Sequence, residues 1–173
     1  SYELKQKWPD CRITWVVEPA SRGIVGMDAC VDDIIIFEKQ AFRSLGGFLQ
    51  HFGPLKRAIQ SRRYDLVLDL QGLFKSAAIA YLAKAPKGRK LGPVDMREGS
   101  DHVSRPVRGP HAKGHVIERY LDVVRSIGCN VPYAPDGSAV HFPIEVPTEA
   151  VAAAAARFRQ AGADMKTPYI TIP

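Results

Sequence analysis

The sequence contains few cysteines and no long apolar run. Its three cysteines, Cys11, Cys30 and Cys129, lie far apart without CxxC spacing, so neither a disulfide framework nor a zinc site is predicted. No apolar stretch approaches the roughly 20 residues that a membrane-spanning helix needs. The first residues do not resemble a signal peptide. These absences favour a reducing, cytoplasmic setting.

Motifs of several enzyme classes are also missing. There is no GxGxxG dinucleotide fingerprint, no Walker motif and no nucleophile elbow. The histidines form no HExxH motif, and His102, His111 and His115 lie in or beside a segment rich in glycine and proline, which argues against a metal site. Glu18, Asp69 and Glu98 are acids that could act as bases, but the sequence shows no partner for any of them.

The composition that remains is that of a core-forming protein. The chain has 173 residues, of which 46% are hydrophobic and 24% charged. This length suits one α/β domain or one lobe of a larger enzyme, and the composition excludes a disordered chain, collagen and a pure coiled coil.

Positive charge is concentrated in two regions. The net charge is +6, from 24 basic and 18 acidic residues. Residues 38–63 hold six basic residues against one acid, and residues 86–114 hold seven against three. Such a regional excess indicates an anionic partner, such as a phosphate, an acidic sugar or a membrane head group. The alternative is that these are solvated faces that keep the protein soluble.

Strand and helix patterns alternate along the chain. Strands are predicted from β-branched and apolar runs at residues 12–18, 31–38, 64–71, 89–94, 140–146 and 169–173. Helices are predicted from three- and four-residue apolar spacing at residues 43–62, 73–85, 115–127 and 149–161, and residues 1–7 have the composition of a helix end. This alternation predicts an α/β fold with a doubly wound, mostly parallel sheet.

Some local features refine this prediction. The Gly53-Pro54 pair is expected to break or kink its helix. Helix 73–85 is apolar almost all round and is expected to be buried. The segment between residues 94 and 114 is expected to form a long loop that is functional or mobile. Gly128 and Gly162 fit helix C-termini, and Thr148 fits a helix N-cap.

The junction from Asp69 to Ser76 is the first candidate site. It follows the clearest strand, and ligands of open α/β sheets collect at the carboxyl ends of strands. Gly72 permits a tight turn into the next helix, whose free N–H groups could bind an anion. Lys75 stands in the first helical turn, where the helix dipole disfavours a cation unless an anion lies nearby. In the alternative, Lys75 extends to water and pairs with Asp69.

Two arginines complete the candidate set. Arg97 lies in the long loop and Arg119 lies near the start of helix 115–127. A guanidinium group binds carboxylates and phosphates in a forked geometry. The alternative for Arg119 is an ion pair with Asp122 on a solvated helix face.

A family resemblance joins these residues. The segments TWVVE (14–18), YDLVLDLQGLFKS (64–76), MRE (96–98) and HVIER (115–119) occur in an order that resembles the N-terminal half of glycosyltransferase family 9, the ADP-heptose:lipopolysaccharide heptosyltransferases. The DxQGLxKS block is the most specific of them. The resemblance extends over nearly the whole chain.

The resemblance implies the N-terminal lobe of a GT-B glycosyltransferase, truncated at both ends. Residues 1–147 would form the Rossmann-like acceptor lobe, and residues 148–173 the interlobe helix and the first strand of the donor lobe. The parent enzyme would transfer heptose from ADP-heptose to the Kdo-containing inner core of lipopolysaccharide, on lipid A, with inversion. It would need no cofactor and no metal. The implied acceptor-binding residues are Asp69, Gln71, Lys75, Arg97 and Arg119, with Lys39 and Arg43 at the rim.

The resemblance also implies what this chain does not hold. The family's base is expected upstream of Ser1 and its donor-binding residues after Pro173, so no catalytic residue is assigned and the fragment alone is expected to be inactive. The implied location is the cytoplasm, with a peripheral contact at the inner membrane and no nucleic-acid partner. The alternatives are another GT-B sugar-nucleotide enzyme with a different acceptor, or a non-enzymatic module that binds anions such as nucleic acid or a membrane.

Overall fold

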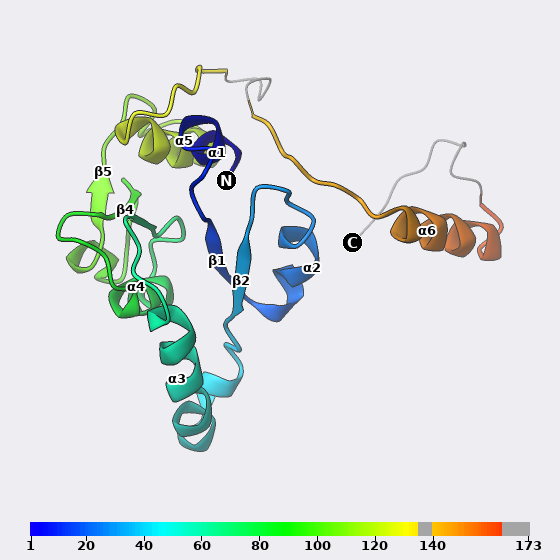
Figure 1. Cartoon of the computed structure of the whole chain (residues 1–173), viewed down its shortest axis with the longest axis horizontal. Helices are drawn as coiled ribbons and strands as arrows, with labels where there is room; N and C mark the ends of the chain where they lie inside the picture. Colours follow the sequence, from blue (N-terminus) through cyan, green and yellow to red (C-terminus); the bar gives the residue numbers. More distant parts are fainter. Residues whose placement is uncertain (135–139, 164–173) are drawn as a thin grey trace.

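The computed structural model describes residues 1–134 and 140–163. Its elements are, in order, α1 (Tyr2–Lys7), β1 (Thr14–Val17), η1 (Pro19–Ser21), α2 (Arg22–Val25), β2 (Asp33–Ile36), η2 (Ala41–Arg43), α3 (Leu45–Gln60), β3 (Val67–Leu68), α4 (Phe74–Leu82), β4 (Lys90–Pro93), η3 (Ser100–His102), β5 (Arg105–Val107), α5 (Val116–Ser126) and α6 (Thr148–Gln160). The alternation of strands and helices predicted from the sequence is therefore confirmed (Figure 1).

The strands form two parallel sheets. β1 pairs with β2, with Trp15 opposite Ile34, and β3, β4 and β5 pair in that order, with Leu91 opposite both Leu68 and Arg105. β3 is shorter than its apolar run suggests, although the N–H of Asp69, just after the strand, still donates to the Leu91 carbonyl of β4 at 2.8 Å. The parallel arrangement is as predicted, but the strands are divided between two sheets.

Helices pack on both faces of the three-stranded sheet because the apolar run before Asp69 alternates in direction. Leu66, Leu68 and Leu70 pack towards Val123 of α5. Val67 packs the other way, against buried residues of α3 and the end of α4. Ile35 of β2 contacts this second cluster too, so α3 joins the two sheets through one core. This is the doubly wound arrangement that the sequence predicts.

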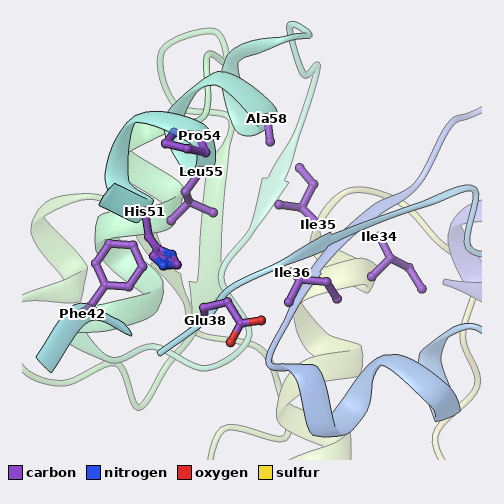
Figure 2. A pocket seen from close by; sticks show the side chains of 9 residues that line it. All are labelled: Ile34, Ile35, Ile36, Glu38, Phe42, His51, Pro54, Leu55 and Ala58. Atoms are coloured by element: carbon purple, nitrogen blue, oxygen red, sulfur yellow. The ribbon is translucent and has the colours of Figure 1, made fainter. Parts of the chain in front are cut away.

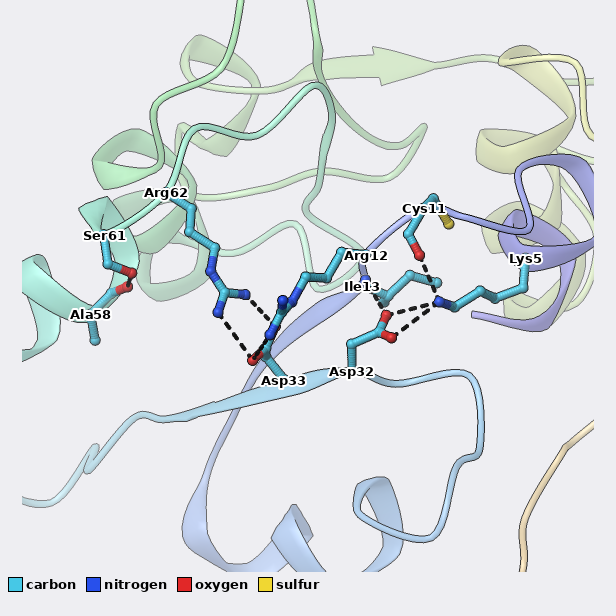
Figure 3. Close-up of polar contacts among 9 residues, drawn as sticks. All are labelled: Lys5, Cys11, Arg12, Ile13, Asp32, Asp33, Ala58, Ser61 and Arg62. Carbon is cyan, nitrogen blue, oxygen red and sulfur yellow. Dashed lines mark hydrogen bonds and ion pairs between the residues drawn. The ribbon is translucent and has the colours of Figure 1, made fainter.

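Charged residues hold α1 and the start of the two-stranded sheet together (Figure 3). The Lys5 ammonium donates to Asp32 at 3.0 Å and to the Cys11 carbonyl at 2.6 Å. Arg12 makes a forked contact with Asp33, at 2.7 Å and 3.1 Å, and Arg62 binds the same carboxylate. The guanidinium groups of Arg12 and Arg62 hold the pKa of Asp33 well below its usual range.

Four local predictions were wrong. Helix α3 is not broken at Pro54, which is exposed, so that the backbone carbonyl left without a donor can be hydrated; the kink expected as the alternative stays a prediction. Phe74 and Tyr81 of α4 are exposed rather than buried. Thr148 is the first residue of α6, not its cap.

The fourth error concerns the 140–146 segment, which forms only an isolated bridge between Asp28 and Ile144. The predicted long loop also contains β5, an edge strand whose central residue, Pro106, has no N–H to donate. The predicted strand at 169–173 lies outside the described residues.

Helix α6 lies apart from both sheets in Figure 1 and has no buried residue. The predicted domain boundary between residues 147 and 148 stays a prediction. Among the described residues, no helix has the length and apolar character needed to cross a membrane.

Candidate functional site

The turn after β3 is held by a buried carboxylate. Asp69 is only 4% exposed, and its Oδ1 accepts a hydrogen bond from the Gly72 N–H at 2.9 Å. Gly72 has a φ of 60°, a backbone conformation that residues other than glycine disfavour. Asp69 Oδ2 is buried and has no hydrogen-bond partner in the described part of the chain. A buried carboxylate oxygen without a donor is costly, so the turn holds an unsatisfied acceptor.

The 95–98 loop lies directly against this turn. The Gly72 carbonyl accepts hydrogen bonds from the Arg97 N–H and the Ser100 hydroxyl, both at 2.8 Å. A Cβ at Gly72 would lie 3.2 Å from Met96 Cα. Because Gly72 has no side chain, the 95–98 loop can approach the turn closely. The backbone of Arg97 is thereby held next to the turn.

Glu98 occupies the place where an anion was expected. Its carboxylate accepts a hydrogen bond from the Phe74 N–H at 3.1 Å, at the start of α4. The Ser76 hydroxyl satisfies the neighbouring Leu73 N–H at 3.1 Å. The prediction of a free anion site at this helix start was therefore wrong for these two N–H groups. A negative carboxylate is favoured there by the same helix dipole that would have favoured a ligand.

The three predicted cations surround the 95–98 loop. Lys75, one residue after Phe74, is exposed, and Asp69 does not pair with it. Arg97 is exposed on the loop itself. Arg119 reaches the loop from α5 and forms an ion pair with Asp95. The structure thus places the chain segments that carry Lys75, Arg97 and Arg119 next to one another, because Phe74 is bonded to Glu98 and Arg119 to Asp95; that the three side chains share one binding site stays a prediction.

Arg119 does not pair with Asp122, so the alternative for this residue was wrong. Its side chain is 24% exposed. Its Nε is buried without a partner in the described part of the chain. Like Asp69 Oδ2, it is a buried polar atom that no described residue satisfies. Both atoms come from residues that the sequence had selected as site residues.

The remaining predicted residues are less closely joined to this cluster. Gln71 is exposed on the turn itself. Lys39 follows β2 and pairs with Glu18, which follows β1, at 3.2 Å. Arg43 is exposed at the end of η2. Within residues 1–134 and 140–163, no hydrogen bond or ion pair joins the side chain of Lys39 or Arg43 to the 95–98 loop. Their place at the rim stays a prediction.

A cavity of about 350 Å³ lies between β2 and α3 and is mostly apolar (Figure 2). Its walls include Ile34, Ile36 and Leu55, and its titratable groups are Glu38 and His51. None of the predicted site residues lines it. Its apolar walls suit a hydrocarbon group better than the carboxylates of an acidic sugar.

The sequence did not reveal a buried charged cluster on α5. Asp122 Oδ2 accepts from the His111 N–H, and Oδ1 lies 2.8 Å from His111 Nδ1. Arg125 donates to Asp122 at 3.0 Å and to Glu118 at 2.8 Å. Burial by itself raises the pKa of Asp122, but the bonds from His111 and Arg125 outweigh it and lower the pKa. The only local signal was the i,i+3 spacing of Asp122 and Arg125. The cluster fastens the 109–112 segment to α5.

Metal ligation finds no support in the geometry of the described residues. No group of three or more His, Cys, Asp or Glu side chains in residues 1–134 and 140–163 is arranged to hold a metal ion. The absence of a metal requirement stays a prediction.

Comparison with known proteins places the chain in a family. The family model described as glycosyltransferase family 9 (heptosyltransferase) matches residues 53–172. The chain belongs to glycosyltransferase family 9. The match includes the Asp69–Ser76 turn, the 95–98 loop and α5, so the elements that form the candidate site are family elements.

Curated relatives and solved structures agree with this membership. The lipopolysaccharide heptosyltransferases 1 of Escherichia coli O18:K1:H7 and K12 are 27% identical in an alignment of 158 residues, and the match covers 86% of this chain. The solved E. coli heptosyltransferase WaaC with ADP superposes with a TM-score of 0.63 at 26% identity over 77% of this chain. WaaC with ADP-2-deoxy-2-fluoro heptose gives 0.62. The GT-B type of α/β fold expected from the sequence is confirmed by this similarity.

The chain spans about half the length of these family 9 relatives. It covers 48% and 49% of the two curated sequences, and 43% and 44% of the two solved chains. The activity of a whole enzyme is therefore a matter of proposal.

Proposed function

We propose that this chain is the acceptor-side lobe of a heptosyltransferase that transfers heptose from ADP-heptose to the Kdo-containing inner core of lipopolysaccharide. The observation that carries the proposal is the family 9 match across the candidate site. The relatives are named lipopolysaccharide heptosyltransferases, and the solved WaaC structures hold ADP or a fluorinated ADP-heptose. The proposed location is the cytoplasm.

The cluster around the 95–98 loop suits an acidic sugar acceptor. Lys75 and Arg97 are exposed cations, and Arg119 has a buried Nε without a partner. Arginine binds carboxylates in a forked geometry, as the carboxylate of a Kdo residue would require. Asp69 Oδ2 can accept a hydrogen bond from a sugar hydroxyl or from another part of the enzyme. These residues bind and orient the acceptor, and no proton transfer is assigned to them.

The test is a transfer assay on the full-length protein. ADP release is measured with ADP-heptose and a Kdo-bearing lipid A, and then with other sugar nucleotides. Of the sugar nucleotides tested with the acceptor, we expect only ADP-heptose to give turnover. We expect Arg97→Ala and Arg119→Ala to weaken acceptor binding. Arg89→Ala is the matched control because Arg89 is exposed and precedes the central strand β4, so it lies at the amino end of the strand and not at the carboxyl end, where the 95–98 loop follows.

Two results would oppose the proposal. Turnover with a different sugar nucleotide, and none with ADP-heptose, would assign the chain to another GT-B enzyme. Acceptor affinity that is the same in Arg97→Ala, Arg119→Ala and Arg89→Ala would remove the acceptor site from the 95–98 loop.

A further inference from the structure

The 95–98 loop is fastened at its start to α5 and to the turn after β3. Asp95, its first residue, forms an ion pair with Arg119 of α5. Met96 lies against Gly72, where a Cβ would stand 3.2 Å from Met96 Cγ. The first two residues of the loop are therefore held by contacts with two different elements.

The last residue of the loop, Glu98, is held by its side chain in a strained backbone conformation. In the described part of the chain it is the one residue other than glycine with a positive φ, 57°. Glycine adopts this conformation without strain, whereas a residue with a Cβ does not. The Glu98 carboxylate accepts a hydrogen bond from the Phe74 N–H at 3.1 Å, at the start of α4. Strain that a specific contact maintains is typical of functional positions.

Arg97 lies between these contacts, and its own side chain is unpaired. Its N–H donates to the Gly72 carbonyl at 2.8 Å, and its carbonyl accepts from the Ser100 N–H at 3.1 Å. The Arg97 guanidinium is exposed and forms no hydrogen bond or ion pair with the described residues, the neighbouring Glu98 included. The backbone on both sides of Arg97 is thus fixed, while its guanidinium stays exposed to solvent.

We propose that Glu98 is a positioning residue, which holds the loop through the Phe74 N–H so that the Arg97 guanidinium meets a carboxylate of the acceptor. This role rests on the proposed function, which supplies an anionic acceptor. A forked contact between a guanidinium and a carboxylate requires a defined direction of approach, and a small displacement weakens it. Because the Arg97 side chain has no partner among the described residues, its direction depends on the backbone that Gly72 and Glu98 hold.

Two other roles for Glu98 predict different results. As a simple charge, Glu98 would repel an anionic acceptor, so its removal would lower the KM for that acceptor. As a helix cap only, it would stabilise α4, so its removal would lower the free energy of unfolding and leave the KM unchanged. Positioning predicts that removal of the carboxylate raises the KM for the acceptor.

The experiment is steady-state kinetics of the full-length protein with ADP-heptose and a Kdo-bearing lipid A. Glu98→Gly removes the carboxylate and the backbone strain together, so the urea midpoint should change little. The KM for the acceptor should rise roughly tenfold, the order of one hydrogen bond to a charged group, with kcat nearly unchanged. Glu98→Gln keeps an oxygen that can accept from the Phe74 N–H, and it should recover most of the lost affinity.

The double variant Arg97→Ala/Glu98→Gly shows whether Glu98 acts through Arg97. Its KM for the acceptor should equal that of Arg97→Ala, because a residue that positions the guanidinium has no effect once the guanidinium is absent. A merely structural role would not produce this coupling. Asp101→Asn is the matched control, because it removes an exposed negative charge from the neighbouring η3. It should not raise the KM.

Three results would overturn the positioning role. They are an unchanged or lowered KM in Glu98→Gly, a loss of affinity in Glu98→Gln as large as in Glu98→Gly, and effects of Arg97→Ala and Glu98→Gly that multiply in the double variant. Turnover with a different sugar nucleotide, and none with ADP-heptose, would overturn the proposed function instead. The same comparison of KM values with that nucleotide would still decide the role of Glu98.

Discussion

Replacing Asp122 by asparagine is expected to destabilise the protein by removing the centre of the α5 charged cluster. The carboxylate is 2% exposed and accepts from the His111 N–H, from His111 Nδ1 and from Arg125. Asparagine has nearly the same size, so the change removes charge and acceptor capacity without opening a cavity. Arg125 and the His111 ring then lose an anionic partner in a buried place.

The magnitude follows from what the partners keep. Breaking a buried ion pair by removing one member costs about 3–5 kcal/mol. Arg125 retains Glu118 at 2.8 Å and the carbonyls of Val131 and Pro132 at 2.9 and 3.0 Å. We therefore expect the lower end of that range, about 3 kcal/mol of unfolding free energy.

Urea denaturation followed by circular dichroism measures this change. Asp101→Asn is the matched control, because Asp101 is exposed in η3, and it should change stability by less than about 0.5 kcal/mol. The reasoning is refuted if Asp122→Asn and Asp101→Asn shift the urea midpoint equally. That result would mean that His111 and Arg125 lose nothing when the carboxylate is removed.

Two further predictions concern acid stability and the candidate site. Because folding lowers the pKa of Asp33, its ion pairs stabilise the protein above the unfolded pKa of about 4, and this stabilisation is lost as the pH falls towards the folded pKa. Asp33→Asn should therefore reduce the loss of stability between pH 5 and pH 3, measured by urea denaturation at both pH values. A loss of stability equal to that of the unmodified protein would contradict this prediction. Gly72→Ala adds backbone strain of about 1–2 kcal/mol and a close contact to Met96, so it should lower both stability and kcat/KM for the acceptor. Gly88→Ala, with a φ of 78° and open space around it, should lower stability only; equal kcat/KM in the two variants would separate the turn from the site.

Local pattern in the sequence was enough to find most of the secondary structure. The apolar run before Asp69 predicts a buried strand, and the spacing of Val116, Tyr120 and Val123 predicts α5. These patterns depend on residues that are close together in the sequence, so they can be read without knowing the fold. β5 escaped because Arg105-Pro106-Val107 has neither alternation nor length, and only its pairing with β4 makes it a strand.

The candidate site was found in part. Lys75, Arg97 and Arg119 could be selected from residue type and position, and the family resemblance joined them. No sequence spacing predicts that Glu98 accepts a hydrogen bond from the Phe74 N–H, 24 positions away, or that Asp95 pairs with Arg119. Such pairs form because a turn at Gly72 and the parallel pairing of β3 and β4 bring distant segments together.

By itself, the sequence determined the α/β alternation, the turn at Gly72 and the regional positive charge, because each depends only on residues that are neighbours in the sequence. The tertiary structure alone decided which of those charges are paired, where Asp122 is buried, and that Leu45 and Leu49 stay exposed while Ile59 does not. Burial and ion pairing depend on which surfaces meet when the chain closes on itself, and the same helical stripe can therefore be core at one end and surface at the other.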